Sequence, residues 1–280
     1  MDEGTLGGQS FVIDLARWMV GREVDFRPEI EDVVCGKPRL RVINVSYPSD
    51  RGTPGLQNVS LDVCSAEILG IAGVSGNGQR ELAEVITGLR EATTGRIELD
   101  EKDISNLPPI DRTNRLLSYI PEERMRDSMI KNFTMSENLI LREHHKQPFS
   151  KQGLLNLKAI SDHSEKLISI FQIKTPSQET LAKSLSGGNI QKVVVARELS
   201  REPRVIVAAQ PTRGLDVGAT EYVRERLLEE RKAGTAVLLI SEDLDEIFAL
   251  ADRIAVIYEG QIMGIVPREE ASPEKLGLLM

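Results

Sequence analysis

The chain has 280 residues, of which 40% are hydrophobic and 28% are charged, enough for the core of one large domain or two small ones. Its formal net charge of −8 and pI of about 5.2 argue against a nucleic-acid-binding protein, which normally presents a basic face. Apolar runs such as 68–74 are far shorter than the ~18 residues that span a bilayer, and the first residues lack the pattern of a secretory signal. Cys35 and Cys64 have no metal-ligand spacing and are interpreted as free thiols of a cytoplasmic protein.

The first sixty residues contain one predicted helix, a linker and two predicted strands. Residues 11–24 carry apolar side chains at helical spacing, and the prolines at 28 and 38 mark 27–37 as a linker. Segments 40–44 and 58–63 alternate apolar and polar residues, which predicts two antiparallel strands. Tyr47 lies between these strands, before a turn rich in glycine and proline at 52–55.

A glycine-rich loop follows the short apolar segment 67–72 and precedes a predicted helix over 81–88. A buried strand, a glycine loop and a helix are the context of a phosphate-binding loop with the pattern G-x-x-x-x-G-K-[ST]. Gly73 and Gly78 are in register with this pattern, but Gln79 replaces the lysine and Arg80 replaces the serine or threonine. The backbone cradle depends on glycines and helix position, so it can still hold a phosphate. Its expected members are Ser75, Gly76, Asn77 and Gly78.

The middle of the chain changes from strand to helical character. A strand over 116–120 breaks at a proline and is followed by Glu122. Residues 125–195 have helical periodicity and polar loops, which predicts an inserted helical subdomain. All three histidines lie there without metal partners in the sequence, so they are interpreted as solvated. The subdomain ends in the sequence Leu185-Ser186-Gly187-Gly188-Asn189-Ile190-Gln191-Lys192, in which Ser186 can cap a helix running from 189 to about 200.

The last third contains two more buried strands and a hairpin. Strand 204–209 leads into Gln210-Pro211-Thr212-Arg213-Gly214-Leu215-Asp216-Val217-Gly218, and strand 236–240 ends at Ser241-Glu242-Asp243-Leu244. Segments 254–258 and 261–266 are predicted to form a hairpin, and 269–279 a short helix.

Two of these sequences carry a family resemblance. Leu-Ser-Gly-Gly with Gln191 close behind resembles the signature loop of ATP-binding-cassette (ABC) ATPases. The Pro-Thr-Arg-Gly-Leu-Asp-Val-Gly run resembles the D-loop region of the ABC branch that imports simple sugars and nucleosides. The resemblance covers roughly residues 11–280. It implies an α/β P-loop NTPase fold of ABC type, with a mixed sheet core, an antiparallel β subdomain and the inserted helical subdomain. Residues 1–37 resemble the tail of a preceding cassette, so 38–280 would be the second cassette of a tandem protein.

The resemblance also assigns roles to residues. Leu185, Ser186, Gly187, Gly188 and Gln191 would reach an ATP held by a partner cassette, and Gly214, Leu215 and Asp216 would form the D-loop. Tyr47 lies near the place of an aromatic that stacks on adenine, although packing at a strand end is an alternative. Glu122 takes the place of a glutamine that touches Mg²⁺ and the coupling surface, with a surface charge cluster as the alternative.

Four positions depart from the catalytic pattern of the family. Gln79 lacks the charge of the lysine, and Glu242 replaces a histidine that contacts the γ-phosphate. Ala209 and Gln210 replace an Asp-Glu pair that positions Mg²⁺ and polarises the attacking water. We therefore expect the chain to bind ATP and to serve a partner's site while hydrolysing weakly or not at all. Mg²⁺ is possible, although its usual ligands are missing.

The resemblance predicts an ATP-binding component of an importer for nucleosides or simple sugars. Its partners would be a second ABC cassette, transmembrane permease subunits and an external solute-binding protein, and it would lie on the inner face of the cell membrane. One alternative is a self-sufficient ATPase acting as a homodimer. Another is a soluble ABC protein of translation or DNA maintenance, which a basic arm or a coiled-coil insertion would indicate.

Overall fold

The computed structural model describes residues 34–48 and 55–280. The helix expected over 11–24, most of the linker and most of the turn at 52–55 lie outside the described residues.

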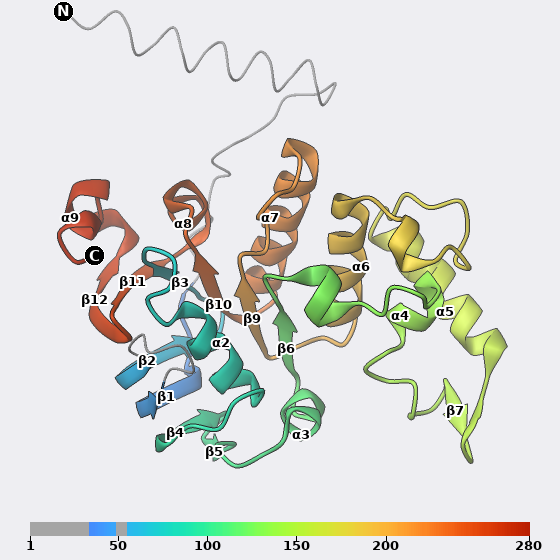
Figure 1. Cartoon of the computed structure of the whole chain (residues 1–280), viewed down its shortest axis with the longest axis horizontal. Coiled ribbons are helices and arrows are strands. Elements are labelled where there is room, and N and C mark those ends of the chain that lie inside the picture. The colour runs from blue at the N-terminus through green and yellow to red at the C-terminus, as the bar shows by residue number, and fades with distance from the viewer. Residues whose placement is uncertain (1–33, 49–54) are drawn as a thin grey trace, which may run out of the picture.

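A six-stranded sheet with the order β12-β11-β3-β10-β9-β6 forms the centre of the molecule (Figure 1). Neighbouring strands run parallel from β11 to β6, and β12 pairs antiparallel with β11. Every residue of β3, β9 and β10 is buried, as expected for parallel strands that are covered on both faces. The bounds are β3 Ile68–Ala72, β6 Leu117–Ile120, β9 Val205–Ala209, β10 Ala236–Ser241, β11 Arg253–Tyr258 and β12 Gln261–Pro267.

A four-stranded antiparallel sheet with the order β2-β1-β4-β5 covers one side of this core. It confirms the two predicted N-terminal strands and lengthens both. Helix α2 (Gln79–Thr87) is buried between the two sheets, where Leu82, Val85 and Ile86 share one apolar cluster with side chains from both. Helix α3 (Pro109–Asn114) follows this sheet. The strand bounds are β1 Pro38–Tyr47, β2 Leu56–Cys64, β4 Thr94–Leu99 and β5 Lys102–Asp103.

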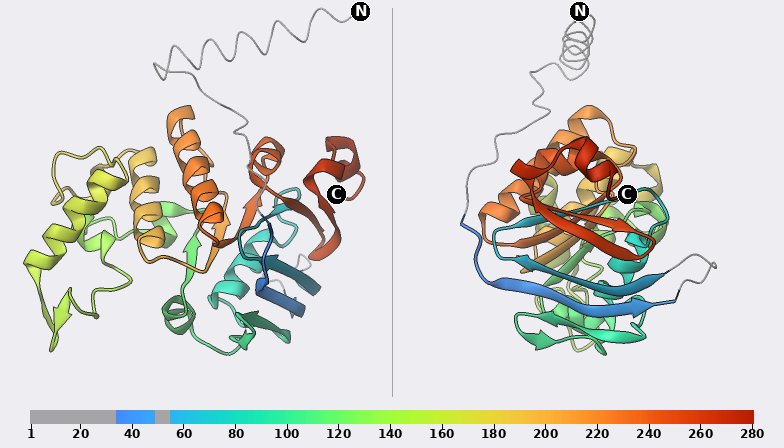
Figure 2. Two further views of the ribbon diagram at one scale, coloured as in Figure 1. Left: turned by 180° about the vertical axis from the view of Figure 1, so that it is seen from behind. Right: turned by 90° about the vertical axis from the view of Figure 1, so that its left-hand side faces the viewer.

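Helices cover the opposite face of the central sheet. Figure 2 shows the four-stranded sheet (blue to green) and the C-terminal helices (orange to red) on opposite sides of the core. The cluster on the helical side joins the sheet to α6 (Gly187–Leu199), α7 (Val217–Lys232) and α8 (Leu244–Leu250). Most residues of α6 are buried, which explains the mixed apolar spacing of its sequence.

The predicted helical subdomain is present between β6 and β9 (Figure 1). It starts with a π-helical turn at Arg124–Ser128 and ends with α6. A buried ion pair anchors it, since Arg197 Nε lies 3.0 Å from Glu198 Oε1 while Arg197 Nη1 donates to Ser128 O at 2.6 Å. The remaining elements are α4 Met135–Leu139, β7 Ser150–Lys151, β8 Leu154–Leu155, α5 Leu157–Ile170 and a 3₁₀ turn at Ala182–Ser184.

Three helix boundaries differ from the predictions. Helix α2 begins at Gln79 rather than at 81, and α6 begins at Gly187 rather than at 189, because its two glycines form the first turn. The C-terminal helix over 269–279 was wrong in extent. A 3₁₀ turn at Arg268–Glu270 is followed by α9 (Pro273–Gly277), whose first turn holds the proline and is capped by Ser272. Within the described ranges, no helix combines the length and apolarity needed to cross a membrane.

The turn of the β11–β12 hairpin holds the glycine loop in place. Gly260 N donates to Asn77 O at 3.0 Å, and Glu259 N donates to Asn77 Oδ1 at 2.9 Å. Gln57 N in turn donates to Gly260 O at 2.8 Å, so the turn also binds β2. A Cβ atom on Gly260 would lie 1.7 Å from Gly55 O, so only glycine fits there.

We predict that Gly260→Ala destabilises the protein far more than Gly153→Ala. The two glycines have φ of +76° and +80°, so both substitutions carry the cost of a left-handed alanine, about 1 kcal/mol. A Cβ on Gly153 meets nothing within 4 Å, whereas the clash at Gly260 should add at least about 2 kcal/mol. Urea unfolding of both variants measures the difference, and equal losses would contradict this account of the hairpin turn.

Candidate functional site

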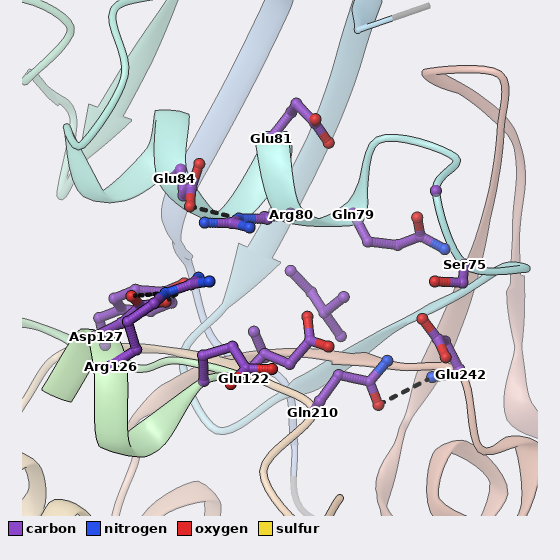
Figure 3. Close-up of a pocket in the computed structure, with 15 residues that line it drawn as sticks. Ser75, Gln79, Arg80, Glu81, Glu84, Glu122, Arg126, Asp127, Gln210 and Glu242 are labelled. Atoms are coloured by element: carbon purple, nitrogen blue, oxygen red, sulfur yellow. Dashed lines mark hydrogen bonds and ion pairs between the residues drawn. The ribbon is translucent and has the colours of Figure 1, made fainter. Parts of the chain in front are cut away.

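A cavity of about 330 Å³ lies where the carboxyl ends of β3, β6, β9 and β10 meet. This edge is the usual ligand position in open α/β sheets. The cavity brings together predicted residues from four distant segments of the chain. They are Ser75, Gly76, Gln79 and Arg80 after β3, Glu122 after β6, Ala209 and Gln210 at the end of β9, and Glu242 after β10. Figure 3 shows the side chains of the glycine loop and α2 on one side, facing Glu122, Gln210 and Glu242 on the other.

The side chain of Gln79 closes the glycine loop internally. Its Nε2 donates to Val74 O at 2.8 Å, and its Oε1 accepts from Asn77 N at 2.9 Å. The residue is only 8% exposed, so the amide lies inside the loop rather than in the open cavity. The loop therefore keeps its shape without a cation, but an anion would have to compete with Gln79 for the N–H of Asn77.

Acidic side chains outnumber basic ones around this cavity. Among the lining residues, six carboxylates accompany two arginines, Arg80 and Arg126. Both arginines are already engaged. Arg80 Nε lies 2.7 Å from Glu84 Oε1, and Arg126 Nε lies 2.7 Å from Asp127 Oδ1, a contact that lowers the pKa of Asp127. A bare triphosphate would thus meet an excess of negative charge.

The two positions expected to bind metal and to activate water, Ala209 and Gln210, carry no carboxylate. Ala209 ends β9 in a methyl group, and Gln210 has a positive φ of 48°. Gln210 N donates to Ile240 O at 2.8 Å, and Gln210 Oε1 accepts from Glu242 N at 3.4 Å, so this side chain links the ends of β9 and β10. Mg²⁺ requires oxygen ligands. Arg80 and Ala209 have none in their side chains, so these residues do not fit a magnesium site.

Glu122 is held by the loop that follows β9. Its carboxylate forms an ion pair with Arg213, and the guanidinium of Arg124 donates to the carbonyl oxygen of Arg213. In the same loop, Gly214 adopts φ of +65° and Leu215 is half-buried. Asp216 caps α7 by accepting from Ala219 N at 2.9 Å. The loop after β6 and the expected D-loop are therefore one connected unit.

The expected signature loop lies outside the cavity. Ser186 caps α6, as predicted, and its Oγ accepts from Asn189 N at 3.4 Å. Ser186 and Gly187 are exposed, and a Cβ on Gly187 would meet nothing within 4 Å. Of the described residues that line the cavity, none belongs to 185–191. The exposed amides at the start of α6 are thus available to another molecule.

The other three residues expected in the signature loop contact the body of the protein. A Cβ on Gly188 would lie 3.1 Å from Ala219 Cβ, so α6 and α7 approach closely there. Leu185 packs against the helical-side core. Gln191 is buried, and its Nε2 donates to Pro211 O at 2.7 Å. The signature helix is therefore bonded directly to the segment that joins β9 to the D-loop.

Tyr47 lines a second hollow, which shares Glu84, Tyr119 and Asp127 with the first cavity. Arg90 Nη1 donates to the Tyr47 hydroxyl at 2.9 Å, and its guanidinium lies over the ring at 5.2 Å. The ring therefore lies near the C-terminal end of α2, and one of its faces already carries an arginine.

Glu246 was missed by the sequence analysis. It is 1% exposed, and Thr212 Oγ1 and Ser241 Oγ each donate to its carboxylate at 2.7 Å. Burial raises the pKa of Glu246, while the two hydroxyl donors oppose the increase. This network joins α8 to the ends of β9 and β10, and only its place five residues after Ser241 could have indicated it.

Comparisons with known proteins agree with this geometry. The family model described as "ABC transporter" matches residues 56–213. The chain is 44% identical over 267 residues to the guanosine import ATP-binding protein NupO of Bacillus subtilis, covering 95% of this chain and 52% of that protein. It is 45% identical over 269 residues to the glucose import ATP-binding protein TsgD13 of Haloferax volcanii, covering 95% and 49%. The chain thus spans about half the length of these relatives.

The fold also matches a solved structure. A nucleotide-free ATP-binding cassette from an ABC transporter superposes with a TM-score of 0.72 at 24% identity, covering 87% of this chain and 99% of the other. This likeness shows that the fold is that of an ABC ATPase, as expected from the sequence.

We predict that the effect of Glu246→Gln on stability depends on pH. The folded-state pKa is raised, so the stabilising contribution is complete below the unfolded value and is lost as pH rises through the folded value. Relative to the natural chain, the glutamine variant should gain stability from about pH 4.5 upward, by at most about 1.4 kcal/mol per pH unit.

Unfolding by urea at several pH values measures this gain. Arg224 and Asp243 also act on Glu246, and both are present in either protein. Glu269→Gln, at an exposed glutamate, is the matched control. A stability difference that stays constant with pH would show that folding does not shift the pKa of Glu246.

Proposed function

The chain belongs to the ABC transporter family, and on this premise we propose that it is the ATP-binding component of an importer for nucleosides or simple sugars. The names of its relatives, a guanosine import and a glucose import protein, support this class of solute. Because the chain spans about half of these relatives, we also propose that it corresponds to the second cassette of a tandem pair.

One observation carries the proposal for its mechanism: the signature loop is intact and exposed, while the chain's own cavity lacks the catalytic groups. Ser186 and Gly187 present the capped start of α6 to solvent. A nucleotide on a partner cassette would meet these amides and the hydroxyl of Ser186, and charge developing on its γ-phosphate would be stabilised there. In this role the chain completes its partner's ATPase site.

The chain's own site would hold a nucleotide without turning it over. Gln210 is not basic, so it cannot take a proton from water, and Glu242 would repel the γ-phosphate. Loss of a general base costs ~10²–10⁴-fold in rate, and loss of a stabilising donor costs ~10²–10³-fold. These factors do not add, but either one leaves little activity.

The remaining partners follow from the proposed class. The chain would sit on the cytoplasmic face of the membrane against permease subunits, which receive solute from an external binding protein. Opening and closing of the cassette pair around ATP would move the permease. A homodimer would contain the same four losses in both of its sites, so it is the weaker proposal. Among the described residues, no coiled-coil insertion supports a soluble, non-transport ABC protein.

We predict that the purified chain binds a fluorescent ATP analogue in the presence of Mg²⁺ but does not hydrolyse ATP. The fourfold variant restores Gln79→Lys, Ala209→Asp, Gln210→Glu and Glu242→His on an Arg80→Thr background. It should raise turnover at least ~100-fold, because a metal ligand, a base and a phosphate donor return together. Phosphate release measures turnover. Rapid hydrolysis by the natural chain, at ~1 s⁻¹, would overturn the assignment of a degenerate site.

We further predict that two inactive chains complement each other. The fourfold variant that also carries Gly187→Arg has a competent cavity but a blocked signature, so it should not hydrolyse ATP alone. Mixed with the natural chain, which supplies an intact signature, it should regain activity up to about half that of the fourfold variant per pair, because one of the two composite sites in a mixed pair is complete.

The control for this experiment uses two glycines at helix ends. A Cβ meets nothing within 4 Å at either Gly187 or Gly277, so arginine should be tolerated by the fold at both. A natural-sequence chain with Gly187→Arg should fail to complement, and one with Gly277→Arg should succeed. Complementation by both would show that Gly187 does not face the partner's nucleotide.

A further inference from the structure

The two cysteines of the chain lie side by side, although 29 positions separate 35 from 64 in the sequence. Their Sγ atoms and a carboxylate oxygen of Glu67 all lie within 4.8 Å of one another. Backbone bonds bring the segments together, since Gly36 N donates to Ser65 O at 3.0 Å and Ser65 N donates to Lys37 O at 2.9 Å. The cluster lies at the end of β2, outside the set of residues that line the nucleotide cavity.

The carboxylate of Glu67 is fixed in its orientation toward the thiols. Its Oε2 accepts from Cys64 N at 2.6 Å and lies 3.9 Å from Cys35 Sγ. Its Oε1 is bound by the guanidinium of Arg253, and the residue is 2% exposed. A partner that orients a carboxylate through its second oxygen is typical of the outer shell of metal sites.

A further oxygen donor lies next to Cys64, outside the group of three mutually close ligand atoms. Asp62 Oδ2 lies 3.7 Å from Cys64 Sγ, and Arg253 Nη2 also lies 3.4 Å from Asp62 Oδ2. Four ligands at tetrahedral bond lengths of about 2.0–2.3 Å stand roughly 3.3–3.8 Å apart. The observed separations of 3.7 and 3.9 Å are already close to this spacing, and exposed Cys35 gives an ion a path from solvent.

We propose that Cys35, Cys64 and Glu67 form a binding site for a thiophilic divalent cation, Zn²⁺ in a cell, with water or a reoriented Asp62 side chain as the fourth ligand. Two thiolates with carboxylates suit this ion better than Mg²⁺ or Ca²⁺, which select oxygen alone. Both thiols lose their protons to solvent when the two metal–sulfur bonds form, and no electron is transferred. A free thiol is mostly protonated near neutral pH, so each of the two releases its proton only as the metal binds.

Such a site would fasten the segment before β1 to the end of β2 and the start of β3. The ion would join Cys35 to Cys64 and Glu67, which β2 and the turn before β3 hold in place. The proposal does not depend on the nucleotide cavity or on the identity of a transported solute.

Titration of the reduced full chain with Cd²⁺ tests the proposal. Cd²⁺ bonded to thiolate gives an ultraviolet charge-transfer band, and this band reports on the pair alone because the chain has two cysteines in total. We expect saturation at one Cd²⁺ per monomeric chain, displacement by Zn²⁺, and a higher midpoint of thermal unfolding with either ion. Cys35→Ser, at an exposed position, should weaken binding by at least ~10-fold.

The matched control is Val34→Ser, which changes the neighbouring exposed side chain and leaves both thiols in place. It should bind Cd²⁺ as the natural chain does. Glu67→Gln should weaken binding while keeping the thiolate band. A missing band, one Cd²⁺ shared by two chains, or unchanged affinity in Cys35→Ser would each overturn the site. A disulfide formed in place of metal binding would overturn it as well.

Discussion

The glycine loop after β3 is held in a phosphate-binding shape by an uncharged side chain, and the rest of the site depends on this arrangement. Gln79 satisfies the carbonyl of Val74 and the amide of Asn77, while Asn77 binds the turn of the β11–β12 hairpin. Neither a lysine nor a bound anion is needed to keep the loop folded. The loop can therefore keep its folded shape without the positive charge that a lysine at position 79 would supply.

Further contacts connect the edge of the cavity to the exposed signature. Gln191 bonds the signature helix to Pro211, two residues after the end of β9. The next residue, Thr212, donates a hydrogen bond to the buried carboxylate of Glu246. Arg213, which follows Thr212, forms an ion pair with Glu122. The signature helix and the D-loop segment therefore rest on the strand ends that border the cavity.

The sequence predicted the fold where hydrophobic runs and glycines carry the information, as for the two N-terminal strands, the strand before Gly73 and the hairpin at Gly260. It gave no prediction for α7, whose buried residues include Glu221, Arg224 and Arg231, so its apolar periodicity is weak. Several residues that the motifs mark line one cavity at the edge of the sheet, and their roles stay predictions. Tertiary partners could not be predicted, because a contact such as Cys35 with Cys64 leaves no regular spacing in the sequence.

The four departures from the catalytic pattern are compatible with one another in this structure. A lysine at position 79 would lose the acceptor that Gln79 offers to Asn77 N, and its charge would draw Glu242 across the cavity. A glutamate at position 210 could still accept from the backbone N–H of Glu242, but it would add a carboxylate to a cavity that Glu242 already lines. Each catalytic group therefore needs the others in place before it is stabilised, and a single restored residue would meet an environment adapted to its absence.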